Sequence, residues 1–134
     1  MCITNYYSRI VMVFGVDLMS VITLCGSTKF TKEMLIRQWE LTKQGHIVLG
    51  WCIIPDLYSS DSHHIAEEEN VEEIMDSVHK KKIDMSDYII VINVNDYIGE
   101  STKSEILYAS QHFKAVVYAY PHTQREWEKE SEGL

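Results

Sequence analysis

Strands and helices alternate along most of this chain, and this alternation limits the possible folds more than any other feature. Apolar runs rich in β-branched residues, typical of buried strands, cover residues 20–24, 46–54, 87–93 and 115–120. Segments with apolar side chains at helical spacing lie between them, at about 28–43, 65–82 and 101–113. Right-handed crossovers then predict an α/β fold: a small doubly wound, Rossmann-like or flavodoxin-like parallel sheet with helices on both faces.

The chain has 134 residues, enough for one domain with a single core. The organised part is residues 19–121, followed by a charged C-terminal tail, 122–134. Within the N-terminal extension, 1–18, the apolar stretch 9–16 is either an extra edge strand or part of an upstream extension, with Met19 as the natural start. The tail favours a loose helix, in which Trp127 anchors back onto the domain or onto a partner.

Helical spacing also predicts which side chains face the core. In the first helix these are Phe30, Met34 and Leu41, widened by Leu35 and Trp39, with Arg37 turned to water. In the second they are Ile65, Val71, Ile74, Met75 and Val78, and in the third Ile106, Ala109, Ser110 and Phe113. The continuous apolar character of 46–54 predicts a fully buried strand.

The net charge of −8 argues against binding to a nucleic-acid polymer or to a membrane surface, because little bulk attraction for phosphates exists. The three cysteines show no paired spacing, which favours the reducing cytoplasm over a disulfide framework. His63 and His64 are adjacent and poorly arranged to bind one ion together. We therefore expect no metal and no cofactor.

Two turns rich in small residues follow the first and third strands, Gly26-Ser27-Thr28 and Gly99-Glu100-Ser101-Thr102. The loops at the carboxyl ends of neighbouring parallel strands lie on one edge of the sheet, so we expect both turns to face one crevice. Backbone N–H groups at a helix start bind anions such as phosphate, and Lys29 adds a cation; alternatively, Ser27 or Thr28 is only a helix cap. Tyr97 either stacks on a base or anchors its loop.

Glu105 is the strongest candidate for a reacting group. We expect it in the first turn of its helix, either completing a capping box with Ser101 or Thr102, or kept ionised by a pKa that the helix start lowers. Cys25 is either an activated thiol or a small packing residue; no histidine partner for it is evident, which favours packing.

Three short motifs, taken in order, resemble the nucleoside 2-deoxyribosyltransferase-like superfamily, which includes N-glycosidases of nucleoside 5′-monophosphates. They are Cys25-Gly26-Ser27, Asp87 before Tyr88-Ile89-Ile90-Val91, and Gly99-x-Ser101-x-x-x-Glu105-x-x-x-Ala109. The resemblance covers about residues 21–118. It implies that Glu105 attacks the anomeric carbon of a nucleoside or nucleotide and that the loops bearing Gly26, Ser27, Gly99 and Ser101 hold the ligand. It also implies a homodimer or larger homo-oligomer that completes the pocket.

The sequence departs from the family at several positions. His79 stands where the family usually has an aspartate, and it serves either as acid on the leaving base or as a ligand for phosphate or base. Asp84 either takes over the carboxylate role or faces solvent. Thr23 and Leu24 replace the orienting tyrosine of the transferases, which favours binding or hydrolysis over base exchange. The hydrolases continue this turn with Arg-Gly-Gly. Here Lys29 would have to replace the arginine, as a point charge without its bidentate geometry.

An alternative function is a non-catalytic nucleotide-binding or sensing module on the same fold. A third reading, a scaffold that binds protein partners through its acidic surface and the Trp127 tail, has little support in the sequence.

Overall fold

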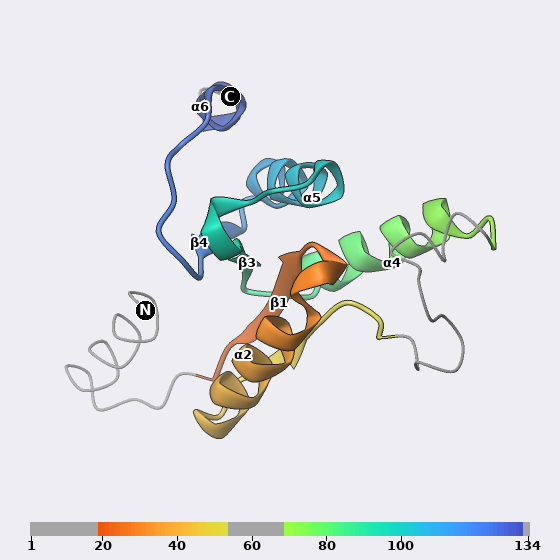
Figure 1. Cartoon of the computed structure of the whole chain (residues 1–134), viewed down its shortest axis with the longest axis vertical. Coiled ribbons are helices and arrows are strands. Elements are labelled where there is room, and N and C mark those ends of the chain that lie inside the picture. Colours follow the sequence, from red (N-terminus) through yellow and green to blue (C-terminus); the bar gives the residue numbers. More distant parts are fainter. Residues whose placement is uncertain (1–18, 54–68, 133–134) are drawn as a thin grey trace.

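The computed structural model describes residues 19–53 and 69–132 and contains a four-stranded parallel sheet. The strand order is β2-β1-β3-β4, so the chain moves outward from β1 in both directions, as in a doubly wound fold (Figure 1). The strands are β1 (Val21–Gly26), β2 (Ile47–Leu49), β3 (Tyr88–Ile92) and β4 (Ala115–Tyr118). The predicted fold class is confirmed.

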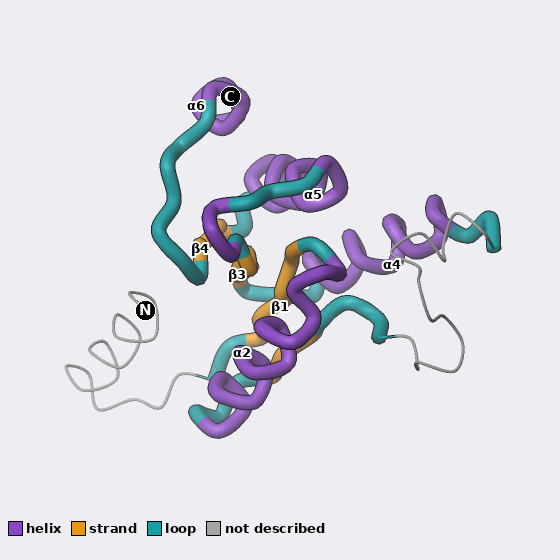
Figure 2. Tube along the Cα trace, in the orientation of Figure 1, coloured by secondary structure: helices purple, strands orange, loops and turns teal. Residues whose placement is uncertain are grey.

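Helices follow the strands on both faces of this sheet (Figure 2). They are α2 (Thr31–Lys43), α4 (Glu72–Asp84), α5 (Glu100–Gln111) and α6 (Glu126–Glu132), with 3-10 turns η1 (Thr28–Phe30) and η2 (Val94–Asp96) after β1 and β3. None of the helices in the described ranges has the length and apolar character needed to cross a bilayer.

Two apolar layers form because successive side chains of a strand point to opposite faces. In β3, Ile90 packs with the α2 residues Met34 and Leu41, whereas Ile89 packs with Ile83 of α4 and with α5. All five residues of β3 are buried, which makes it the centre of the fold.

The second strand, β2, is shorter and more exposed than predicted. The apolar run predicted a fully buried strand over 46–54, but the observed strand has three residues and Ile47 is half exposed. Among the described strands β2 pairs with β1 alone, so it lies at the edge of the sheet, where one side lacks a neighbouring strand. Ile54 lies outside the described residues.

The second correction concerns the first helix. Leu35 and Trp39 are exposed and do not widen its inward face, whereas Arg37 is buried at 6% exposure. The buried positions are Met34, Arg37 and Leu41, which follow the helical spacing of three and four residues. The 3-10 turn η1 also separates Thr28–Phe30 from the α-helix predicted to begin there.

For the second helix, the apolar residues predict the wrong buried face. Ile74, Met75 and Val78 are exposed, and the buried residues of α4 are His79 and Ile83. The first turns of α4 extend away from the sheet (Figure 1), so apolar side chains there have little of the sheet to cover. Ile65 lies outside the described residues, as does the start predicted for this helix.

The end of the third helix differs from the prediction, whereas the C-terminal tail agrees with it. Phe113 is 98% exposed rather than inward, because it follows the end of α5 with a positive φ of 60°. Trp127 of α6 packs against the core layer that contains Ile106 and Ala109, so the tail does anchor onto the domain. His122 reinforces this: its Nδ1 lies 2.7 Å from Asp96 Oδ1, and its Nε2 lies 2.9 Å from the Glu128 carboxylate.

Candidate functional site

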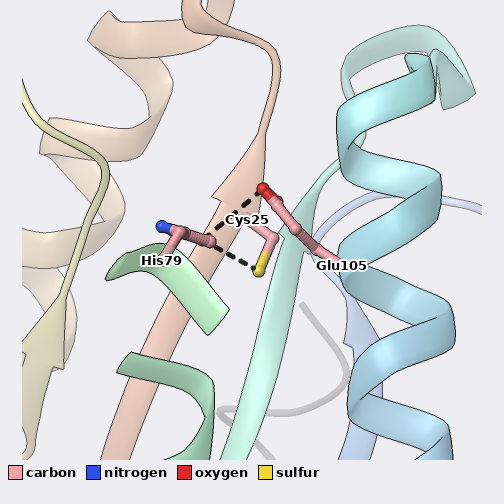
Figure 3. Close-up of side chains that lie close together, drawn as sticks. All are labelled: Cys25, His79 and Glu105. Carbon is pink, nitrogen blue, oxygen red and sulfur yellow. Dashed lines mark hydrogen bonds and ion pairs between the residues drawn. The ribbon is translucent and has the colours of Figure 1, made fainter. Parts of the chain in front are cut away.

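Three buried side chains from different elements meet near the carboxyl end of β1 (Figure 3): Cys25 of β1, His79 of α4 and Glu105 of α5. The imidazole lies between the other two groups, with its Nε2 3.4 Å from Cys25 Sγ and 3.6 Å from Glu105 Oε1. Cys25 is fully buried, and His79 and Glu105 are each 8% exposed. We call these three residues the Cys–His–Glu cluster.

Glu105 is held in its neutral form rather than ionised. Burial raises its pKa to about 8, and the negative charge of Asp76 adds to this while Lys80 opposes it. The expected lowering of the pKa is therefore wrong. Because α5 begins at Glu100, Glu105 lies in the second turn, beyond the free N–H groups of the helix start.

One oxygen of this carboxyl group has no partner. Glu105 Oε2 is buried without a hydrogen bond among the described residues, and α5 has no side-chain cap at Gly99. The alternative of a capping box from Ser101 or Thr102 to Glu105 is not realised, because the N-cap of α5 is Gly99 and both residues lie inside the helix, Ser101 exposed and Thr102 buried. An unsatisfied buried oxygen costs stability, so this position is not explained by packing alone.

The other two groups of the cluster are also neutral near pH 7. Burial lowers the pKa of His79 to about 4, assisted by Lys82 and opposed by Asp76. Burial, followed by the charge of Glu105, raises the pKa of the Cys25 thiol well above its usual value, so Cys25 is not an activated thiol. Cys25 does have a histidine partner, His79, contrary to the sequence-based expectation. These residues are 54 positions apart, and no local pattern predicts their contact.

The two predicted ligand loops contact each other through Tyr97. Lys29 Nζ lies 3.3 Å from the centre of the Tyr97 ring, and the Phe30 ring meets the same ring edge-on at 5.9 Å between centroids. Tyr97 therefore anchors its loop, although its 46% exposure leaves surface for a ligand. Ser27 acts as the cap of η1, since its Oγ accepts from the Lys29 backbone N–H at 3.4 Å.

The close packing at these loops requires a glycine at Gly26 but not at Gly99. A Cβ on Gly26 would lie 3.1 Å from the Ile92 carbonyl oxygen and 3.2 Å from the Trp51 ring, so a side chain would crowd the junction of β1 and β3. Gly99 is the N-cap of α5, and a Cβ there would only touch Tyr97.

Asp84 lies apart from the Cys–His–Glu cluster. It is exposed near the end of α4 that leads into β3, and its Oδ1 accepts a 2.7 Å hydrogen bond from the Tyr108 hydroxyl. It lines an open groove of about 420 Å³, whose other described lining residues are Glu73, Asp76, Ser77, Lys80, Lys81 and Tyr108. The structure therefore does not bring Asp84 to Glu105.

Asp87 and Thr23 have structural contacts. The Asp87 carboxylate accepts the Val21 N–H at 2.7 Å, and the Thr23 hydroxyl donates to the Lys82 carbonyl at 3.0 Å. These contacts fix β1 to the last turn of α4 and to the segment that leads from it into β3. The polar loop that follows β2, 56–64, lies outside the described residues.

Comparisons with protein-family models, with curated proteins and with solved structures find no significant match for this chain. The fold and the site therefore define an α/β protein with a buried Cys–His–Glu cluster at the carboxyl edge of a parallel sheet. The resemblance to nucleoside 2-deoxyribosyltransferases stays a prediction.

Proposed function

We propose that this protein is an enzyme of nucleotide metabolism that cleaves or transfers at the N-glycosidic bond of a nucleoside, a deoxynucleoside or its 5′-monophosphate. The observation that carries the proposal is the position of Glu105: a buried carboxyl group with one unpartnered oxygen, beside an imidazole, at the sheet edge where ligands bind in open α/β folds. The motifs shared with nucleoside 2-deoxyribosyltransferases support the same chemistry.

The protonation states of Glu105 and His79 suit this reaction. Glu105 carries the proton at rest and His79 is neutral, so transfer to Nε2 produces a carboxylate and an imidazolium together. Glu105 then forms a bond to the anomeric carbon while the bond from that carbon to the base nitrogen breaks, and His79 gives its proton to the departing base. Water or a second base releases the sugar from Glu105, and the proton lost by that acceptor restores the pair.

Burial of Glu105 favours the transition state over the resting state. A carboxylate in this position is costly when no positive charge is near, which is why its pKa is raised. Cleavage of an N-glycosidic bond develops oxocarbenium character on the sugar, and that charge would stabilise the carboxylate as the bond breaks.

The loops that follow β1 and β3 are proposed to hold the sugar and any 5′-phosphate. Ser27 and Ser101 offer hydroxyl groups, and Lys29 supplies a point charge near Tyr97. Thr102 is buried under the start of α5 and would act as support. A homodimer in the cytoplasm belongs to the same proposal, since the resemblance implies that a second subunit completes the pocket.

The test is incubation of the protein with deoxynucleosides and their monophosphates, with and without added free base, followed by chromatography. We expect release of free base, or formation of a new nucleoside when a second base is present. Glu105→Gln, which keeps the shape of the side chain, should abolish turnover. Glu72→Gln, at an exposed position of α4 outside these loops, is the matched control and should leave turnover unchanged. A folded protein that releases no base from any member of the panel contradicts the proposal.

A second candidate, a non-catalytic nucleotide sensor, is favoured by one observation: Glu105 is mostly protonated at neutral pH. Titration calorimetry separates the two. Tight nucleotide binding that Glu105→Gln does not change, without any turnover, would support the sensor.

A further inference from the structure

We propose that the Cys–His–Glu cluster also binds one Zn²⁺ ion, through Cys25 Sγ, His79 Nε2 and a carboxylate oxygen of Glu105. Neither the sequence motifs nor the proposed reaction requires a metal. The side chains place one sulfur, one nitrogen and one oxygen donor within 4.8 Å of one another (Figure 3).

The separations match those of a tetrahedral zinc site. With bonds of about 2.3 Å to sulfur and about 2.0–2.2 Å to nitrogen and oxygen, tetrahedral angles place neighbouring ligand atoms about 3.3–3.6 Å apart. The observed separations are 3.4 Å from Cys25 Sγ to His79 Nε2 and 3.6 Å from His79 Nε2 to Glu105 Oε1. The third separation, between Cys25 Sγ and a carboxylate oxygen of Glu105, is no more than 4.8 Å.

The donor set selects the class of metal. A thiolate and an imidazole favour Zn²⁺ and similar thiophilic ions over Mg²⁺ or Ca²⁺, which prefer oxygen ligands. A thiolate, a carboxylate and a neutral imidazole carry two negative charges, which balance a divalent ion in a buried position. Three protein ligands also leave a fourth position open for water.

The unpartnered oxygen is an independent indication of a ligand. Glu105 Oε2 is buried, has no hydrogen-bond partner in the described part of the chain, and belongs to a side chain that is about nine-tenths buried within the cluster. A metal ion would compensate this carboxyl group, either through both of its oxygens or through Oε1 with water on Oε2.

Zinc bound here would switch the enzyme off, a consequence that rests on the proposed function. A carboxylate coordinated to zinc cannot attack the anomeric carbon, and an imidazole coordinated through Nε2 cannot deliver a proton to the base. The site would therefore make the activity sensitive to free zinc.

The experiment uses Co²⁺ as a spectroscopic probe, because a cysteine thiolate bound to Co²⁺ produces a characteristic charge-transfer absorption. The starting protein is the full chain with Cys2→Ser and Cys52→Ser, which leaves Cys25 as its only cysteine. We expect this absorption at one equivalent of Co²⁺, and its loss when Zn²⁺ displaces the cobalt. Circular dichroism checks that each variant is folded.

Adding Cys25→Ser should remove the absorption and weaken Zn²⁺ binding, measured by calorimetry, by more than about 100-fold, the upper end of what loss of a merely supporting group costs. Glu105→Gln should weaken binding while retaining the sulfur signal. Absence of the absorption, or its persistence after Cys25→Ser, would overturn the zinc site. These readouts do not depend on turnover, so they decide the site even if no base is released. In an active protein, inhibition by Zn²⁺ and recovery with a chelator are expected; full activity with zinc bound would refute the switch.

Discussion

Glu105 Oε1 lies 3.6 Å from His79 Nε2, and both side chains are about nine-tenths buried. Burial reverses the usual order of their pKa values: it raises the pKa of the carboxyl group to about 8 and lowers the pKa of the imidazole to about 4. Two groups so close titrate as a pair, and between these values the pair carries one proton. One transferable proton shared by a buried carboxyl group and an imidazole is what the proposed cleavage of a glycosidic bond would use.

The first prediction concerns stability against pH in the metal-free protein. Glu105 has a raised pKa, so its contribution is complete below the ordinary value of 4.5 and is lost as pH rises to about 8. His79 has a lowered pKa, so its contribution is complete above 6.5 and is lost as pH falls to about 4. The two slopes cancel between 4.5 and 6.5, and the free energy of unfolding should fall by about 2 kcal/mol from pH 6.5 to 8.

Urea denaturation at several pH values measures this. Glu105→Gln should remove the loss above pH 6.5 and leave only the contribution of His79, so that stability rises with pH up to 6.5 and then stays level. Asp76, Lys80 and Lys82 also face the pair and change these midpoints, but they do not change the signs. A wild-type protein whose stability is unchanged between pH 6.5 and 8 would show that Glu105 is not buried in its neutral form.

The second prediction assigns the proton that leaves with the base. If His79 protonates the departing base, His79→Asn should slow cleavage of an ordinary purine nucleoside by about 10²- to 10⁴-fold. An N7-methylated purine nucleoside already carries positive charge and leaves without a proton, so its cleavage should change little. Initial rates on both substrates measure this. A merely structural role for His79 would slow both reactions equally.

The class of fold is predictable because its signal is local. The pattern within each segment predicts whether that segment is a strand or a helix. Gly45 marks the end of the first helix, with the positive φ of 94° that glycine tolerates. The faces of the helices are less predictable. Periodicity identifies an apolar stripe, but which residues are covered depends on where the sheet lies, as Trp39 and Arg37 show by exchanging their expected environments.

The candidate site is only partly predictable for the same reason. Glu105 is identified from a motif, and the meeting of the two loops follows from parallel strands. The contact between Cys25 and His79 requires α4 to pack against β1, which no spacing in the sequence encodes. The pKa of Glu105 depends on burial rather than on the helix start, so its direction follows only from the packed structure.

The third prediction tests the observed face of α4. Ile83 is fully buried between α4 and the sheet, so Ile83→Ala should lower the free energy of unfolding by about 2–5 kcal/mol. Ile74, at 61% exposure, is the matched control in the same helix: Ile74→Lys should change it by no more than about 0.5 kcal/mol. Urea denaturation measures both variants. Equal losses would restore the face predicted from the apolar residues.

The fourth prediction concerns the attachment of the C-terminal segment to the loop that precedes Tyr97. The Asp96 carboxylate accepts hydrogen bonds from the Thr123 backbone N–H at 3.0 Å and from Asn93 Nδ2 at 3.0 Å, and it lies 2.7 Å from His122 Nδ1. Burial alone would raise the pKa of Asp96, but the hydrogen bonds from Thr123 and His122 outweigh this and lower it to about 2.

Asp96→Asn should therefore destabilise the protein by about 1–3 kcal/mol at neutral pH, because hydrogen bonds to a charged acceptor are lost. A lowered pKa means that this stabilisation is complete above the ordinary value of 3.8 and disappears as pH falls toward 2, so the wild type and the variant should converge in that window. Glu126→Gln is the control: its exposed ion pair with Lys129 should contribute little at any pH. A difference between wild type and Asp96→Asn that persists undiminished at pH 2 would mean that the ionised carboxylate is not what holds the C-terminal segment.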